Sequence, residues 1–269
     1  MLAFALAVAL APPESLTADE IMTRVAENQE RAQEARARYV YRQDVIGRMV
    51  RGNGKIAREE KRVYTVTPTA DGTTKEMTSL TGRYLKSGQY NEYTEKDFHY
   101  KGLDIDCDLL NDLLDDLVED KDSKDGVDKD LFPLRKEKIE KYVFTLKDTK
   151  PYKGRLVYRI AFRPKDKSDF DWKGEALIDA EEFEPVSIAT NLSRNLPTAV
   201  KVLLGTDIKQ LGYAIDYQRV APRVWFPVSY GTEFHLKAVF FYSRTVTMSV
   251  KSSDFKATEV ESKINYTDK

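Results

Sequence analysis

One stretch limits the possible folds more than any other: residues 224–241, which read VWFPVSYGTEFHLKAVFF. Apolar side chains recur at every second position, which is the period of a β-strand with one buried face. The apolar positions are Val224, Phe226, Val228, Tyr230, Phe234, Leu236, Ala238 and Phe240. Such a strand would span roughly 60 Å, about three times the usual length, so we expect a bend at Gly231 and a bulge near Pro227. Long one-sided strands favour an open or closed barrel around an interior.

The same period of two recurs along most of the chain. It begins at Tyr39, passes a turn at 52–55, continues through a third run to Leu80 and resumes in a fourth at about 83–93. Later runs occupy 141–147, 155–164, 172–179, 185–193, 212–220, 244–255 and 260–266. Turn residues join these runs, so we predict consecutive hairpins in one large antiparallel sheet of about ten to twelve strands.

Two segments have the helical period instead. Thr17 and Glu20 form a capping box that predicts a helix over 18–36. In the second segment the apolar residues share one stripe, with aspartates opposite. This stripe contains Ile105, Cys107, Leu110, Leu113, Leu114, Leu117 and Val118. A lone helix in a β-rich chain must cover something apolar, so we expect it on the concave face of the sheet, as a lid over a cavity or as plain core packing.

The first fifteen residues, MLAFALAVALAPPES, contain an apolar run of signal-peptide length that is far too short to span a bilayer. We therefore expect an exported protein with a leader at 1–15 and a single domain at 16–269. No Lys or Arg precedes the run, and cleavage after Ala11 would leave Pro12 first, so the start codon and the cleavage site stay open. A frayed leader or the first turn of a buried helix is the alternative.

Charge is unevenly distributed along the chain. The formal net charge is −1, which predicts neither nucleic-acid binding nor an acidic substrate. Twelve Asp or Glu residues and three lysines lie between Asp104 and Asp130, within a helical acidic insert at about 101–140 whose role the sequence leaves open. Setting Gly126 as the sixth residue of a calcium-binding loop puts Lys121 at its first ligand position, so we expect no metal there.

Catalytic motifs are missing from the sequence. There is no G-x-S-x-G elbow, no H-E-x-x-H and no glycine-rich phosphate loop. His99 and His235 are the only histidines, and Cys107 is the only cysteine, which excludes disulfides, cysteine metal sites and a lipid-modified N-terminal cysteine. We expect no enzyme, no cofactor and no catalytic residue; a hydrolase that depends on His235 is a weaker alternative.

Several segments together resemble the LolA-like superfamily of outer-membrane lipoprotein-sorting proteins. They are the leader, the capped helix running into YVYRQDV, the central helical insert, WKGEALIDAEEFEPVSI, and VWFPVSYGTEF followed by RTVTMSVKSSDF. The resemblance covers most of the chain after Leu16 and implies an unclosed half-barrel with helices on its concave side. It also implies a periplasmic protein that carries or senses acyl chains. The chain is considerably longer than the simplest carrier of this family, and its acidic insert matches no function of the family.

We therefore predict a non-enzymatic carrier for lipid or for the acyl chains of lipoproteins. Strand alternation nominates Phe226, Val228, Tyr230, Phe234 and Leu236 for the cavity lining, and the central helix adds Leu110, Leu113, Leu114 and Leu117. We expect a monomer without a membrane span, whose partners are the lipid and the envelope proteins that donate or accept it. An interaction or sensor module of the same fold without bound lipid is the alternative.

Overall fold

The computed structural model describes residues 16–69, 72–100, 104–118, 135–166, 171–192, 206–209, 211–238 and 242–258. The expected leader, the candidate calcium loop and the expected strand at 260–266 lie outside these residues. The helices are α1 (Ala18–Arg36), α2 (Ile105–Val118) and α3 (Lys136–Ile139). The strands are β1 (Tyr39–Arg51), β2 (Ile56–Pro68), β3 (Thr73–Lys86), β4 (Gln89–Tyr93), β5 (Tyr142–Tyr152), β6 (Arg155–Pro164), β7 (Trp172–Asp179), β8 (Pro185–Leu192), β9 (Thr206–Lys209), β10 (Tyr213–Ala221), β11 (Val224–Ala238) and β12 (Tyr242–Ala257).

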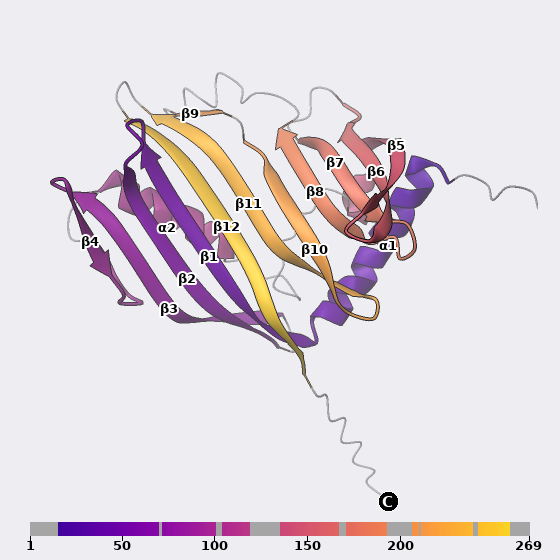
Figure 1. Ribbon diagram of the computed structural model, residues 1–269, viewed down its shortest axis with the longest axis horizontal. Helices are drawn as coiled ribbons and strands as arrows, with labels where there is room; N and C mark the ends of the chain where they lie inside the picture. The colour runs from indigo at the N-terminus through magenta and orange to yellow at the C-terminus, as the bar shows by residue number, and fades with distance from the viewer. Residues whose placement is uncertain are drawn as a thin grey trace, which may run out of the picture.

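All described strands belong to one antiparallel sheet of 12 strands in the order β4-β3-β2-β1-β12-β11-β10-β8-β7-β6-β5, with β9 paired to β11 beside this path. The first and last strands meet in the middle, where β1 pairs with β12. The edge strands β4 and β5 lie at opposite ends of the curved sheet and do not pair, so the sheet is an unclosed half-barrel (Figure 1). The predicted fold class is confirmed.

Local sequence explains most element boundaries. The Thr17 hydroxyl accepts from the Glu20 amide, and the Glu20 carboxylate accepts from the Thr17 amide at 2.8 Å, so the capping box starts α1 where it was predicted. The predicted third and fourth runs are divided differently, because β3 continues to Lys86. Ser87 and Gly88 both have positive φ, 51° and 83°, and turn the chain into the short edge strand β4.

A bulge interrupts the long alternating strand, β11. Opposite β10, Asp216 pairs with Ser229 but Tyr217 pairs with Pro227, so β11 has one extra residue at this point. The pairing is regular through Gly231, where the register with β12 does not shift. The bulge expected near Pro227 is confirmed.

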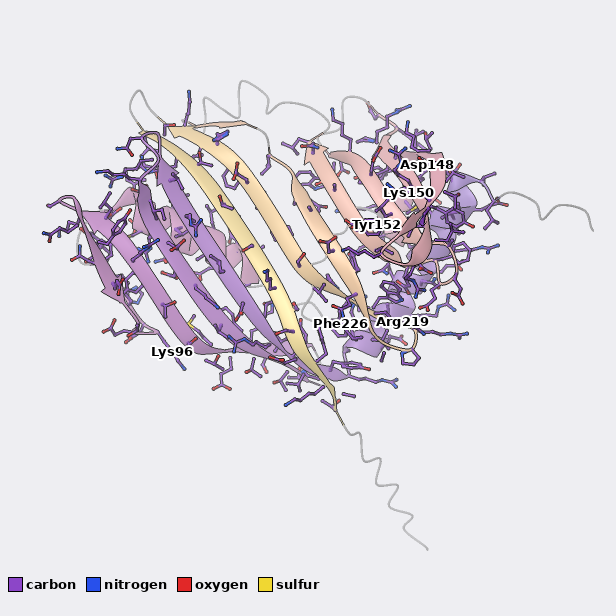
Figure 2. All side chains as sticks on the ribbon, in the orientation of Figure 1. Lys96, Asp148, Lys150, Tyr152, Arg219 and Phe226 are labelled. Atoms are coloured by element: carbon purple, nitrogen blue, oxygen red, sulfur yellow. The ribbon has the colours of Figure 1, made fainter. Side chains whose placement is uncertain are left out.

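The bulge changes which side chains share a face. Trp225 packs in the core under α1, whereas Phe226 belongs to a separate cluster with Tyr41 and Val66, and Val228 packs against that cluster. Figure 2 shows Phe226 at the lower end of β11, with Arg219 beside it. The prediction that all even positions of this strand point into one cavity is therefore wrong. The extra residue at the bulge reverses the alternation, so even positions before the bulge and even positions after it lie on opposite faces of the strand.

Helices α1 and α2 cover two different parts of the same sheet face. Ile21, Met22 and Val25 of α1 pack on a cluster drawn from β5 to β8 and β10, whereas Leu110 and Leu114 of α2 pack on β1, β11 and β12. Both helices lie behind the sheet in the view of Figure 1, α1 behind its β5–β10 half and α2 behind its β1–β3 half. The core is thus divided into an α1 cluster and an α2 cluster.

Candidate functional site

An apolar cavity of about 400 Å³ lies where the α1 cluster meets the α2 cluster. It is lined by Leu109, Leu113, Trp172, Leu211, Tyr213, Tyr230, Thr232, Phe234, Leu236 and Met248. None of these ten residues is charged. The volume is within the usual range of small-molecule sites, roughly 300–1,000 Å³.

Strand register explains why the β-strand residues converge on this cavity. Tyr230, Thr232, Phe234 and Leu236 alternate along β11 after the bulge, so they share one face. Tyr213 lies opposite Thr232 on the neighbouring strand β10 and therefore faces the same side. On the other side of β11, Met248 of β12 pairs with Thr232. The three adjacent strands β10, β11 and β12 consequently form the floor of the cavity.

The lining has two chemically different ends. Trp172, Tyr213 and Tyr230 belong to or pack against the α1 cluster, and we call them the aromatic end. The Trp172 and Tyr213 rings meet edge to face with centroids 4.8 Å apart. Leu109, Leu113, Leu211, Phe234, Leu236 and Met248 belong to or pack against the α2 cluster and form the aliphatic end.

The structure places the sequence-predicted residues in three groups. Tyr230, Phe234, Leu236 and Leu113 line the cavity. Leu110, Leu114 and Leu117 lie in or against the α2 cluster, where they attach the helix to the sheet. Phe226 and Val228 lie in or against the separate cluster described above. The helix stripe also differs at its start, because Ile105 is 64% exposed.

Sequence reasoning missed six lining residues: Leu109, Trp172, Leu211, Tyr213, Thr232 and Met248. The alternation of Tyr213, Ile215 and Tyr217 in β10 is a clear signal of an inward face, and all three are buried. Leu109 lies four residues after Ile105 and four before Leu113, so the helical period was a signal for it as well.

Close approach of α2 to the sheet depends on Gly47 of β1. A Cβ at this position would lie 2.8 Å from both Leu110 Cδ1 and Leu114 Cδ2. The missing side chain therefore sets how deeply α2 is seated. Leu109 and Leu113 on the same helix line the cavity, so the distance between α2 and the sheet also sets the width of the cavity.

Polar contacts attach α2 to the sheet at both ends. At the first turn, Asp106 accepts two hydrogen bonds from the Arg244 guanidinium, at 2.6 and 2.8 Å, and a third from the Tyr242 hydroxyl at 2.8 Å. At the last turn, Lys75 donates to the Val118 carbonyl at 2.8 Å. Also in the last turn, Asp115 pairs with Arg62. The helix is therefore held by buried and half-buried polar groups as well as by apolar packing.

A layer of buried charges from β2 lies beneath α2. Glu60, 1% exposed, accepts from Arg58 at 2.8 Å, from Arg62 at 2.6 Å and from the Tyr93 hydroxyl. Burial alone would raise the pKa of Glu60, but the bonds from Tyr93 and the two arginines outweigh it and hold the pKa below its usual value. Glu60 is consequently an ionised structural carboxylate rather than a proton donor.

A second hollow, of about 670 Å³, lies between α1 and the turns around 181–184 and 219–223, and charged residues dominate its lining. Its most buried acid is Glu184, which accepts a hydrogen bond from Gln29 of α1. Burial raises the pKa of Glu184 to about 7. This hollow is polar and does not continue the apolar cavity.

The histidines and the cysteine do not form a reactive cluster. His99 is exposed, and Nδ1 of His235 lies 2.9 Å from the Thr245 hydroxyl on the neighbouring strand. Cys107 is buried and free, and burial raises the pKa of its thiol to about 11. Among the described residues, no group of acids, histidines and cysteine is arranged to hold a metal ion. None of their helices is long and apolar enough to cross a membrane.

Comparison with known proteins gives matches to solved structures. A LolA superfamily protein from Nitrosomonas europaea matches over 94% of this chain and 99% of its own, with 11% identity and a TM-score of 0.31. An outer membrane lipoprotein-sorting protein domain from Vibrio parahaemolyticus matches over 90% and 95%, with 10% identity and a TM-score of 0.35. These two structural neighbours are thus named as a LolA superfamily protein and a lipoprotein-sorting protein domain. A DUF1329 family protein from Desulfovibrio piger matches over 94% and 96%, with 8% identity and a TM-score of 0.37.

No protein-family model and no curated protein matches the sequence. The half-barrel described above rests on the chain's own strand order and registers.

Proposed function

We propose that this LolA-like chain is a non-enzymatic carrier or binding protein of the periplasm that holds a lipid, or the acyl chain of a lipoprotein, in the cavity between α1 and α2. The observation that supports this most strongly is the apolar cavity of about 400 Å³ in the middle of the covered sheet face. The cavity is half open, since Leu109, Leu113 and Trp172 in its wall are only partly buried, and an apolar hollow of this size that water can enter favours an occupant of the same apolar character.

Partition into this cavity provides the free energy of binding. Burying one methylene group contributes about 0.8 kcal/mol, so a twelve-carbon chain supplies roughly 10 kcal/mol before the cost of ordering it is subtracted. Because none of the described lining residues is charged, recognition of the chain is a matter of shape and apolar area rather than of ion pairing.

Release of so strongly buried a chain requires a change in the cavity wall. Leu109 and Leu113 place α2 in that wall, and its contacts with Arg244, Arg62 and Lys75 resist its displacement. Movement of α2 breaks these contacts, so a partner that competes for them would promote release. This assigns α2 the role of a lid with polar anchors.

Native mass spectrometry after purification from envelope extracts without detergent tests the proposal. We expect an additional mass that dissociates as a lipid or an acylated fragment on collisional activation. A matched variant, Leu236→Arg, places a charge on the cavity floor and should purify without that mass.

A wild-type protein that purifies empty and binds no added acyl compound would contradict the carrier. That result would leave the alternative function, an interaction or sensor module of the same fold that works without lipid.

A further inference from the structure

The charged hollow between α1 and the turns around 181–184 and 219–223 is separate from the apolar cavity. The cavity is lined by Trp172, the first residue of β7, whereas the hollow lies beyond Asp179, the last residue of that strand. At about 3.3 Å per residue, β7 separates the two by roughly 23 Å. Arg219, at the lower end of β10, belongs to the hollow (Figure 2). An occupant of the hollow is therefore independent of a ligand in the cavity.

Most charges in this hollow are not paired with one another. Its lining contains eight charged residues, of which only Glu182 and Arg219 form an ion pair with each other, at 3.3 Å, within the described part of the chain. The eight are Arg24, Glu27, Arg31, Glu181, Glu182, Glu184, Arg219 and Arg223. Glu27 and Arg31 have the four-residue spacing that favours an ion pair on a helix, yet Arg31 donates to Asn28 instead. The hollow thus keeps opposite charges apart.

The wall of the hollow has a fixed shape. Nδ2 of Asn28 in α1 donates to the carbonyls of Glu182 and Phe183, at 2.7 and 3.1 Å. Phe183 and Arg223, one in each turn, have positive φ angles of 53° and 58°, a conformation that is costly for a residue other than glycine. Backbone strain of this kind concentrates at ligand sites, so it supports a binding role for the hollow.

The arginines of the lining suit a phosphate group. Arg31 comes from α1 and Arg223 from the turn between β10 and β11, and neither forms an ion pair with any described residue. A guanidinium group bonds two oxygens at once, so two such groups need more oxygens than a carboxylate offers. A phosphate has enough for both.

The acids of the same lining require a positive charge on the ligand as well. Glu27 and Glu181 are exposed and line the hollow together with the arginines. A simple anion would be repelled by these two carboxylates, and a simple cation would be repelled by the arginines. A molecule that carries both charges meets an opposite charge at each end.

We propose that the hollow binds an aminoalkyl phosphate, a zwitterion whose phosphate lies between Arg31 and Arg223 and whose ammonium group lies beside Glu27. Residues four apart on a helix have Cβ atoms about 5–6 Å apart, so a short alkyl linker between the two charged groups matches Glu27 and Arg31. The ligand is a free aminoalkyl phosphate or a lipid headgroup of the same chemistry. This site goes beyond the proposed function and does not depend on it.

Calorimetric titration of the full chain with O-phosphoethanolamine, inorganic phosphate and ethylammonium tests the proposal. O-phosphoethanolamine should bind more tightly than either probe with a single kind of charge. Arg31→Gln and Arg223→Gln should each weaken its binding by about 10-fold, the effect of one hydrogen-bonded charge. Glu27→Gln should weaken it as well, but should leave inorganic phosphate unchanged or tighter, because a like charge is removed. A merely structural role of Glu27 would weaken both.

Glu34→Gln is the matched control, because Glu34 is an exposed acid of α1 outside the lining. It should change none of the three affinities. All four substitutions affect exposed side chains, so the midpoint of urea unfolding should change little. They should also leave unchanged the affinity of the apolar cavity for methyl decanoate, an acyl ester whose binding is measured by displacement of a fluorescent dye.

Two measurements on the wild-type protein give the position and the source of the ligand. Backbone amide chemical shifts should change on addition of O-phosphoethanolamine within 24–35, 181–184 and 219–223. Phosphatidylcholine vesicles with and without phosphatidylethanolamine distinguish the two sources. Binding that increases with phosphatidylethanolamine indicates a lipid headgroup, and binding of the free probe alone indicates a soluble aminoalkyl phosphate.

The possible failures are distinguishable. Shift changes centred on Tyr230 and Phe234, or inorganic phosphate that binds as tightly as O-phosphoethanolamine, would contradict the zwitterion site. A protein that binds methyl decanoate but not O-phosphoethanolamine contradicts only this proposal. A protein that binds O-phosphoethanolamine but no acyl compound contradicts only the proposed function.

Discussion

Glu60 is the residue that joins the buried charges under α2. Its carboxylate accepts from Arg58, Arg62 and Tyr93, and both arginines also donate to Asn111 of α2 at 3.2 Å. Replacing it, as in Glu60→Gln, leaves the buried Arg58 guanidinium without a carboxylate and Arg62 with only the half-exposed Asp115, so we expect a loss of about 3–5 kcal/mol in the free energy of unfolding. Urea denaturation at neutral pH measures this loss.

The neighbouring Glu59 provides a matched control. It points to the other face of β2, where it pairs with Arg48 and, at 3.0 Å, with Arg83 in more exposed surroundings. Glu59→Gln should cost at most about 1 kcal/mol. Equal effects of the two substitutions would contradict a special role for Glu60. Because the pKa of Glu60 is lowered, its contribution is present at neutral pH and is lost as the pH falls through that lowered value.

Glu184 should have the opposite pH dependence. Its pKa is raised from 4.5 to about 7, chiefly by burial, so the folded state binds a proton more tightly than the unfolded state. Stability should therefore be greatest below pH 4.5, fall as the pH rises to about 7 and remain constant above that, as far as this group is concerned. Glu184→Gln should remove this decline and stabilise the protein at pH 8 by about 1–3 kcal/mol.

Urea unfolding at intervals between pH 4 and pH 9 tests this prediction, with exposed Glu181 as the control position in the same turn. Glu181→Gln should leave the pH profile of the wild type unchanged. A Glu184→Gln protein whose stability still falls across the interval would show that another group causes the decline.

At the scale of the elements, sequence periodicity predicted the regular helices and strands but missed the effects of the β-bulge and of the buried charges in β2. The capped helix α1, the helix α2 and most strands follow from capping and alternation, because these patterns depend on neighbouring residues. The bulge near Pro227 was expected, but its consequence for Phe226 was not followed through. The buried charges of β2 were also missed, since a strand with Arg58, Glu60 and Arg62 at alternate positions resembles an exposed one until its partners are known.

Gly47 is the position at which the packing of α2 on the sheet can be tested. Gly47→Val places branched carbons where Leu110 and Leu114 now lie, so it should lift α2 and destabilise the protein by about 1–3 kcal/mol. Because α2 forms part of the cavity wall, affinity for methyl decanoate should change as well. Urea unfolding and dye displacement measure the two effects.

Gly231 of β11 is a matched strand glycine for this experiment. A Cβ there would meet nothing within 4 Å, so Gly231→Val should be neutral or slightly stabilising. A Gly47→Val protein as stable as Gly231→Val, with unchanged affinity, would show that α2 is not seated by this contact.

At the scale of the whole molecule, the cavity is a product of topology. Its lining combines the consecutive strands β10, β11 and β12 with β7 and α2, which come much earlier in the sequence, and it lies where the clusters of two separate helices meet. Alternation along a single strand cannot show where two helices leave part of a sheet uncovered. The sheet was therefore predictable from the sequence, whereas the boundaries of the cavity required the three-dimensional structure.

This arrangement predicts how a ligand should affect the dynamics of the molecule. An acyl chain in the cavity contacts residues from both halves of the sheet face, so methyl decanoate should slow amide hydrogen exchange in α2 and in the facing parts of β10 and β11. At a ligand concentration about 100 times the dissociation constant, the stabilisation approaches about 2.7 kcal/mol. The edge strand β4 contributes nothing to the lining and is the internal control, since amides that exchange there by local opening should be unaffected. Slowing confined to the α1 side, or equal in β4 and α2, would show that the chain binds outside the cavity.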